Sequence, residues 1–228
     1  MTVEGDAAPL DALRAAEIRP KRQGAARTHR LSVGQHQLYR WILRQFAAAN
    51  PPTGAATHAA AGTLGLDATD AFRVLASEDL VHFDPTGRPI VAYPFSAEPR
   101  GHRVLIDGER LVEAMCAIDA LGMAPMLNVS IEINSPDPLT KSEIWVRLDP
   151  GDGAWWEPDA AVVLDGCVDT RGPSFRSCCT TLNFFESGES ALSYLVANPG
   201  VSGQVISVQE AIELGRYTFG DLLTSTEA

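Results

Sequence analysis

Residues 111–127 read LVEAMCAIDALGMAPML, a stretch in which apolar side chains far outnumber charged ones. A run of this length and composition predicts a helix buried in the core, although Gly122 and Pro125 interrupt it near its end. Cys116 and Asp119 stand three residues apart in this run, so on a helix their side chains share one face. The sequence therefore predicts a thiol beside a carboxylate within a buried helix.

Two interpretations of this pair are open. In the first, the thiol of Cys116 and the carboxyl of Asp119 together hold one proton and pass it on, as a donor–acceptor pair in acid–base catalysis. In the second, Cys116 is an ordinary small buried residue and Asp119 forms a local hydrogen bond. The spacing alone favours the second, structural interpretation.

A second group of thiols follows in residues 174–185, SFRSCCTTLNFF, where Cys178 and Cys179 precede an apolar, strand-like run. A disulfide between adjacent cysteines is disfavoured because the ring that it closes is strained. Thiolates from separate segments of a chain can instead bind a soft metal ion, which prefers sulfur to nitrogen or oxygen. The alternative is that both are buried thiols without a ligand, and this segment alone favours that alternative.

Upstream of these segments, the pattern predicts three helices and a hairpin. Apolar residues at helical spacing run from Leu38 to Phe46 and stop at the Asn-Pro-Pro sequence that begins at Asn50, and Asp67 is placed to cap the third helix. The hairpin is predicted around the Asp-Pro-x-Gly turn that begins at Asp84. The helices are expected at 38–46, 58–64 and 68–78, and the hairpin strands at 80–83 and 89–93.

This order of elements is typical of a winged helix, an arrangement that often binds DNA through its last helix. Here residues 67–75 carry one Arg and two Asp, a charge balance that repels phosphate more than it attracts it. We therefore interpret the winged-helix-like part as a scaffold and keep DNA binding as the minor alternative.

Downstream, short strands and helices predict an α+β fold with a mixed or antiparallel sheet. Trp155 and Trp156 look like a paired aromatic patch that follows a turn and serves packing. Strands are expected at 102–106, 128–134, 142–148, 160–164 and 204–207, a further apolar run at 180–185, and helices at 187–197 and 209–217. The predicted organisation is a poorly ordered arm at 1–36, a winged-helix-like domain at 37–95 and an α+β domain at 96–228 that carries both thiol segments.

The composition argues against several classes of protein. The chain has 228 residues and a net charge of −11, which disfavours a large nucleic-acid-binding surface. Its four cysteines form no C-x-x-C pair and its five histidines no H-x₃-H group, so neither a structural zinc site nor a disulfide framework is expected. No apolar run is long enough for a membrane span and the N-terminus does not look like a secretory signal, so we expect a cytoplasmic protein.

In the order in which they occur, the two thiol segments resemble those of the alkylmercury (organomercurial) lyase family. Family members carry Cys-Ala-x-Asp on a buried helix, which residues 116–119 match, and a later Ser-Phe-Cys segment that runs into Asn- or His-Phe-Phe. Aligning residues 183–185 on that last stretch places Cys179 on the family's second catalytic cysteine. The likeness covers roughly residues 37–220, and residues 208–215 look like the family's C-terminal helix.

The resemblance implies that the protein cleaves a carbon–mercury bond by protonolysis, the reaction that detoxifies organomercurials in mercuric resistance. Thiolates of Cys116 and Cys179 would bind mercury, with Asp119 as the third residue at the metal, and Asp119 would relay a thiol proton to the departing carbon. The products would be a hydrocarbon and Hg²⁺, which passes to a low-molecular-weight thiol or to a mercuric reductase. The family requires no organic cofactor.

The chain departs from the family pattern at several positions, and these changes leave the three catalytic positions in place. Asp137 stands where many members have a further, structural cysteine, and Thr181 stands where a His is common. Cys167 and Cys178 are additional thiols, and Cys178 is a candidate extra mercury ligand because of its place beside the second catalytic cysteine.

Two further functions are open at this point. A metal- or thiol-responsive regulator would join a winged helix to a sensor that binds Hg²⁺ without turnover, but a sensor does not need Asp119 and a DNA reader should not have an acidic third helix. A lyase-like fold that acts on another organometal, or on a biosynthetic substrate, is excluded by no residue of the chain. The sequence favours the organomercurial lyase.

Overall fold

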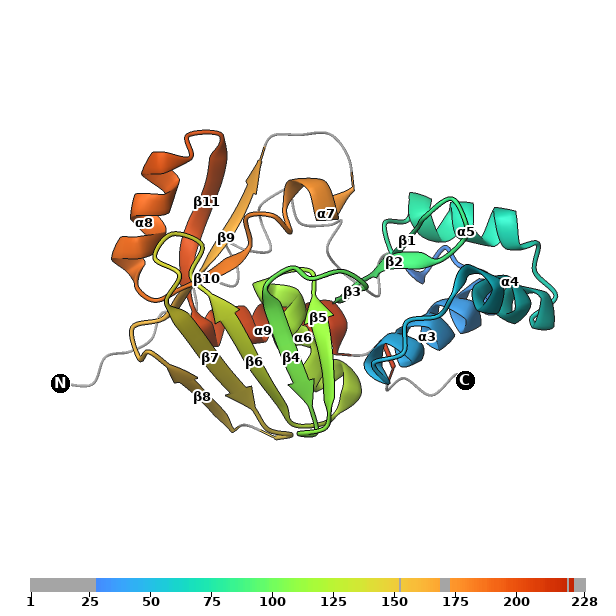
Figure 1. Cartoon of the computed structure of the whole chain (residues 1–228), viewed down its shortest axis with the longest axis horizontal. Helices are drawn as coiled ribbons and strands as arrows, with labels where there is room; N and C mark the ends of the chain where they lie inside the picture. Colours follow the sequence, from blue (N-terminus) through green and yellow to red (C-terminus); the bar gives the residue numbers. More distant parts are fainter. Residues whose placement is uncertain (1–27, 152, 169–172, 221, 224–228) are drawn as a thin grey trace.

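The computed structural model describes residues 28–151, 153–168, 173–220 and 222–223 (Figure 1). Most of the arm predicted at 1–36 therefore lies outside the described residues. The first described long helix, α3 (Val33–Ala47), begins five residues before the predicted start at Leu38. Ser32 caps it: its side chain accepts a hydrogen bond from the Gln35 N–H, and the Gln35 side chain accepts one from the Ser32 N–H.

Two more helices and a hairpin follow in the predicted order. Helix α4 (Gly54–Thr63) is capped by Thr53, and α5 (Ala68–Ser77) by Asp67, whose carboxylate accepts from the Asp70 N–H at 2.8 Å. The hairpin strands are β1 (Val81–Phe83) and β2 (Pro89–Ala92), paired antiparallel. The element order matches the sequence analysis; the winged-helix identity of this part and the domain boundary at 95/96 stay predictions.

The strands form two antiparallel sheets, so the predicted α+β class and the antiparallel pairing are confirmed. The large sheet has the order β1-β2-β3-β5-β4-β6-β7-β8, and the small one the order β10-β9-β11. The other strands of the large sheet are β3 (Phe95–Ser96), β4 (His102–Ile106), β5 (Arg110–Ala114), β6 (Ile131–Pro136), β7 (Glu143–Leu148) and β8 (Ala154–Glu157). The small sheet contains β9 (Val162–Val168), β10 (Asn183–Phe185) and β11 (Val201–Ser207).

The other helices within the described residues are α6 (Ala117–Leu127), α7 (Ser174–Ser177), α8 (Gly188–Ala197) and α9 (Val208–Phe219). Helix α8 packs against the small sheet, whereas α6 packs against β4, β5 and β6 of the large sheet (Figure 1). Helix α9 lies against α6, and Gly215 of α9 packs directly on the backbone of Gly122 in α6. Helices α6 and α9 therefore lie at the centre of the structure that the second half of the chain forms.

The prediction of one helix over 111–127 is wrong, because the run contains a strand and a helix. Its first residues form β5, in which Val112 and Ala114 are buried and Leu111 is 59% exposed, the alternation of a strand with one buried face. The helix begins only at Ala117, and Cys116 is its N-cap residue with extended backbone. Trp155 and Trp156, predicted as an aromatic patch after a turn, belong to strand β8.

Asp137 connects the large sheet to the segment that follows β10. Its buried carboxylate lies in the β6–β7 turn and accepts hydrogen bonds from the Ser190 hydroxyl at 2.7 Å and from the Glu186 N–H at 3.0 Å, both from the β10–α8 region. Burial raises the pKa of this carboxyl, but these bonds and those from the Leu139 and Thr140 N–H groups outweigh burial and lower it overall. The stability that this carboxylate contributes is present above about pH 3.8 and is lost only as the pH falls further.

His102 gives a testable dependence of stability on pH. Its ring is buried between the sheets, with Nδ1 2.9 Å from the Ser135 hydroxyl, and burial lowers its pKa to about 4 against an opposing hydrogen bond with Asn183. The unfolded chain binds this proton near pH 6.5 and the folded chain only near pH 4, so unfolding takes up a proton between these values. We expect the free energy of unfolding to fall by about 2–3 kcal/mol from pH 7.5 to 4.5 on this account.

Urea unfolding of wild type and of His102→Gln at both pH values measures this contribution. Glutamine keeps a polar side chain next to Ser135 and removes the titration. Between pH 7.5 and 4.5, the free energy of unfolding should fall by about 2–3 kcal/mol less in the variant than in wild type. An equal fall in the two proteins would show that His102 does not titrate as its burial implies.

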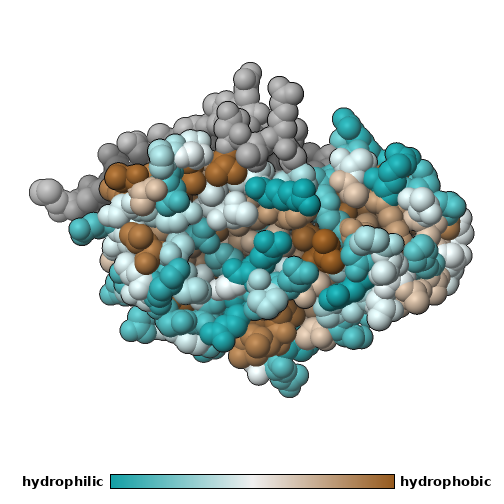
Figure 2. Space-filling model, turned by 45° about the horizontal axis from the view of Figure 1, so that its top comes forward, coloured by the Kyte–Doolittle hydropathy of each residue, from teal (hydrophilic) through white to brown (hydrophobic). Residues whose placement is uncertain are grey.

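The surface carries no extended apolar face in the view of Figure 2, where hydrophobic residues form small patches between polar ones. Among the helices that the structure describes, none has both the length and the apolar character needed to cross a membrane.

Candidate functional site

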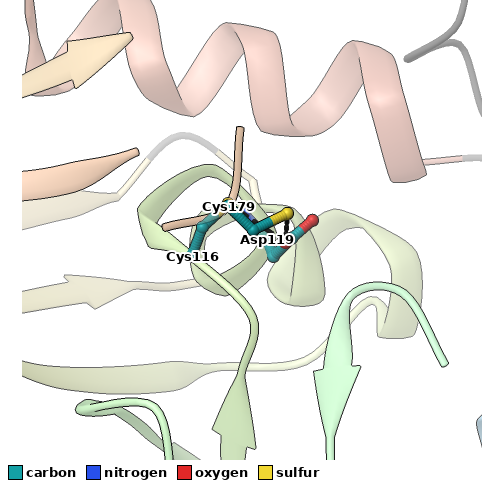
Figure 3. Close-up of side chains that lie close together, drawn as sticks. All are labelled: Cys116, Asp119 and Cys179. Atoms are coloured by element: carbon teal, nitrogen blue, oxygen red, sulfur yellow. Dashed lines mark hydrogen bonds between the residues drawn. The ribbon is translucent and has the colours of Figure 1, made fainter. Parts of the chain in front are cut away.

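Two segments far apart in the sequence bring Cys116, Asp119 and Cys179 together. Cys116 caps α6 and Asp119 lies in the first turn of that helix, whereas Cys179 follows α7. The Ala117 N–H donates to the Leu182 carbonyl at 2.9 Å, so the start of α6 is tied directly to the chain that follows Cys179. In Figure 3 the three labelled side chains point toward one another beneath helix α9.

The Asp119 carboxylate lies within reach of both thiols. The Cys116 Sγ donates to Asp119 Oδ2 at 3.0 Å, and the Cys179 Sγ lies 3.8 Å from the same oxygen. The Asp119 N–H in turn donates to the Cys116 Sγ at 3.4 Å, the cap interaction of the helix. The two sulfurs and a carboxylate oxygen all lie within 4.8 Å of one another, as the ligands of a single ion would.

Cys116 and Asp119 meet at the N-terminal end of α6. The two side chains do meet as predicted, but as an N-cap residue and a first-turn residue and not as two positions on the face of a continuous helix. This placement aims the Cys116 sulfur at the open N-terminal end of α6, where backbone N–H groups favour negative charge. A thiolate at this position is therefore better stabilised than one within a helix.

The site is buried from water. Cys116 is 1% exposed, Asp119 5% and Cys179 8%. Burial raises the pKa of the Cys116 thiol well above its usual value, and the hydrogen bond with Cys179 and the negative charge of Asp119 raise it further. Without a ligand at pH 7, Cys116 is thus a neutral thiol whose proton points at the carboxylate.

A small pocket opens onto these three side chains. Apolar groups and hydroxyl groups share its walls, and α9 contributes to them through Thr218 and Phe219. The other wall residues outside the three are Tyr93, Ile118, Ser174, Cys178 and Leu182. A lining of this kind suits a small ligand with an apolar group.

The two other cysteines differ in their relation to the pocket. Cys178 lies in its wall, is more exposed than Cys179, and accepts a weak hydrogen bond from the Ser177 hydroxyl at 3.7 Å. Cys167 lies in β9, opposite Ser202 of β11. The structure thus places one of the two additional thiols beside the site.

Sequence reasoning did not find Tyr93, Ser174 or Phe219 as site residues. Tyr93 follows the β1–β2 hairpin, Ser174 begins α7 and Phe219 ends α9, so they come from three separate parts of the chain. Ser174 is the first residue of the second thiol segment, but its residue type does not distinguish it from other serines in the chain. None of the three belongs to a motif, and only tertiary contacts bring them to the pocket.

Comparison with known proteins points to one family. Residues 95–220 match the family model described as alkylmercury lyase. The alkylmercury lyase of Bacillus cereus is 33% identical over 156 residues, which are 68% of this chain and 70% of that protein. The alkylmercury lyase of Staphylococcus epidermidis is 28% identical over 186 residues, which are 82% of this chain and 83% of that protein.

A solved structure shares the fold. The crystal structure of the mercury-bound form of MerB2 superposes with a TM-score of 0.73 over 91% of this chain and 100% of that one, at 19% sequence identity. The match to the family model covers more than half of this chain, and the sequence similarity to the relatives extends over most of their length. The chain belongs to the alkylmercury lyase family of enzymes, the carbon–mercury lyases.

Proposed function

We propose that this protein cleaves the carbon–mercury bond of an organomercurial by protonolysis, with Cys116, Cys179 and Asp119 as the catalytic residues. The observation that carries the proposal is the position of the Asp119 carboxylate, 3.0 Å from one sulfur and 3.8 Å from the other. A pair of thiols alone would hold mercury; a carboxylate in contact with both can also move the proton that the reaction needs.

Sulfur suits the first step because mercury is a soft metal. The organomercurial enters with its metal toward the thiols and its organic group in the apolar part of the pocket. The Cys116 sulfur binds mercury and releases its proton to Asp119, to which it already donates a hydrogen bond. The high pKa of Cys116 makes its thiol hold the proton until mercury displaces it.

The second step breaks the carbon–mercury bond. The Cys179 sulfur adds to the same mercury and gives up its own proton, which raises the electron density on the metal and weakens its bond to carbon. Protonated Asp119 delivers its proton to the carbon as the electron pair of that bond returns to it, so the group leaves as a neutral hydrocarbon. Two thiol protons are lost in all: one enters the hydrocarbon, and the other leaves on the thiolate that mercury carried on entry, which departs as a free thiol, while Hg²⁺ stays on the two cysteine thiolates.

Release of Hg²⁺ requires an acceptor with a high affinity for the ion. We propose that a low-molecular-weight thiol or a mercuric reductase takes it by thiolate exchange. We propose that Cys178 is an additional mercury ligand during this exchange, because it lies in the wall of the same pocket and is more exposed than Cys179.

The proposal gives a direct test of protonolysis. Purified protein is incubated in D₂O with phenylmercury and excess thiol, and the volatile product is analysed by mass spectrometry. Because the exchangeable hydrogens of the thiols and the carboxyl are then deuterium, we expect benzene that carries one deuterium, and unlabelled benzene in the parallel H₂O reaction. Phenol, biphenyl or benzene without deuterium would point to a different cleavage and contradict the proposal.

A further inference from the structure

We propose that Asp79 is a positioning residue for Cys179: through Ser174 it holds the segment that carries the second thiol in place beside Cys116. This inference rests on the proposed function for its catalytic consequence. It concerns a residue upstream of the segment 95–220 that matches the family model, in the part of the chain that contains the hairpin.

The contact between Asp79 and Ser174 joins residues that are 95 positions apart. Asp79 Oδ2 accepts from the Ser174 hydroxyl at 2.5 Å and from the Ser174 N–H at 3.1 Å. Hydrogen bonds to an ionised carboxylate are stronger than neutral ones, and two on one oxygen fix both the position and the orientation of the serine. A second contact supports the first, because the Phe175 ring packs against the His82 ring with centroids 4.8 Å apart.

Ser174 in turn fixes the two cysteines. The Ser174 carbonyl accepts from the Cys178 N–H and from the Cys179 N–H, both at 3.0 Å. One short turn therefore links Ser174, which Asp79 holds in place, to the second thiol. Ser174 and Cys179 also line the same pocket. A shift of Ser174 is therefore transmitted to the Cys179 sulfur through backbone hydrogen bonds and not through a flexible side chain.

The Asp79 side chain makes contacts beyond Ser174. The residue follows the C-cap residue of α5 with φ 55°, in the left-handed region, which glycine adopts most readily and which asparagine and aspartate tolerate better than most other residues. Besides Ser174, its carboxylate contacts His82 Nε2 at 2.7 Å and the Tyr93 hydroxyl at 3.4 Å. A glycine here would relieve the backbone but would remove all of these contacts.

The chain offers a matched control in Asp107. It is also a left-handed aspartate, with φ 51°, and its carboxylate also contacts a basic side chain three residues on, that of Arg110 at 2.6 Å. It lies in the β4–β5 turn, away from the pocket. Asp79→Gly and Asp107→Gly therefore make the same chemical change, but only Asp79→Gly removes a contact with Ser174.

The test measures Hg²⁺ binding and turnover separately. Mercuric chloride is titrated into the full chain in competition with dithiothreitol, followed by sulfur-to-mercury charge-transfer absorption, and hydrocarbon release from phenylmercury gives kcat and KM. For Asp79→Gly and Ser174→Ala we expect Hg²⁺ affinity and kcat each to fall by about tenfold or more, since displacement of a reacting group by about 1 Å can cost 10²-fold. KM should change less than kcat. Asp107→Gly should match wild type in both measurements.

The double variant Asp79→Gly/Ser174→Ala should lose no more than Asp79→Gly alone, because the glycine already removes both hydrogen bonds to Ser174. Wild-type affinity and kcat in Asp79→Gly and Ser174→Ala, or an equal loss in Asp107→Gly, would overturn the proposal. If Asp79→Gly does not fold, Asp79→Asn replaces it, since asparagine tolerates the left-handed backbone but cannot accept both sets of hydrogen bonds. If wild type releases no hydrocarbon, the lyase reaction is refuted. If Asp79→Gly and Ser174→Ala still bind Hg²⁺ more weakly than wild type in that case, the positioning role is supported.

Discussion

Replacement of Cys116 or Cys179 by serine, or of Asp119 by asparagine, is expected to lower hydrocarbon release from phenylmercury by about 10²–10⁴-fold, the range that a positioned acid–base group contributes. Serine removes a soft ligand from a site where two sulfurs and one carboxylate oxygen lie within 4.8 Å of one another. Asparagine keeps the shape of Asp119 but can neither take the Cys116 proton nor deliver it to carbon. Steady-state release of benzene in the presence of excess thiol measures all three effects.

The three variants should differ in what they bind. Asp119→Asn keeps both thiols, so it should still take up Hg²⁺, whereas each serine variant leaves a single thiol of the pair and should bind Hg²⁺ far more weakly. Cys167→Ser is the matched control, because Cys167 is also a cysteine but lies in β9. It should release hydrocarbon at the wild-type rate. A loss in Cys167→Ser as large as in Cys116→Ser would mean that the assay reports damage to the fold.

Gly215→Ala is expected to destabilise the protein by about 1–3 kcal/mol, the usual cost of forcing extra atoms into a packed core. A Cβ at Gly215 would lie 2.9 Å from the backbone nitrogen of Gly122 and 3.1 Å from the carbonyl carbon of Leu121, so helices α6 and α9 would have to separate. On the other side of the crossing, a Cβ at Gly122 would overlap the ring of Phe219. Unfolding in urea, followed by circular dichroism, measures the loss.

The opposite sign is expected for Gly62→Ala in α4, where an added Cβ meets no atom within 4 Å. At an exposed helical position, alanine is favoured over glycine by up to about 1 kcal/mol. Because Thr218 and Phe219 of α9 line the pocket, Gly215→Ala should also lower hydrocarbon release, and Gly62→Ala should not. Equal stability of the two variants would show that α6 and α9 do not cross as closely as described.

The sequence was most informative where structure is set by neighbours in the chain. The caps at Asp67 and Ser187 and the hairpin turn at Asp84 act over two to four residues, and the elements that they begin or join lie where they were predicted. The boundary at Cys116 was missed because β5 and α6 follow each other within one apolar run. The four residues before Met115 are too few for their strand-like alternation to stand out from the helix that follows.

The functional site shows what could not be predicted from the sequence. Asp119 and Cys179 lie 60 residues apart, and no local pattern states that they meet; only the resemblance to a family placed them in one site. Tyr93 and Phe219 line the pocket through long-range packing. The contact of Asp79 with Ser174 depends on how the hairpin part packs against α7 and therefore could not be predicted from spacing. The residue types in the sequence indicated the chemistry of the site, whereas the contacts of each residue could be identified only in the folded structure.

The central claim is that the two thiols hold mercury while Asp119 moves the proton. The most direct measurement is a single turnover of phenylmercury on wild type and on Asp119→Asn, with benzene and protein-bound mercury quantified in the same sample. We expect one benzene for each bound mercury in wild type, and in Asp119→Asn bound phenylmercury with little benzene. Tight mercury binding by wild type without benzene, or equal benzene from both proteins, would contradict the account.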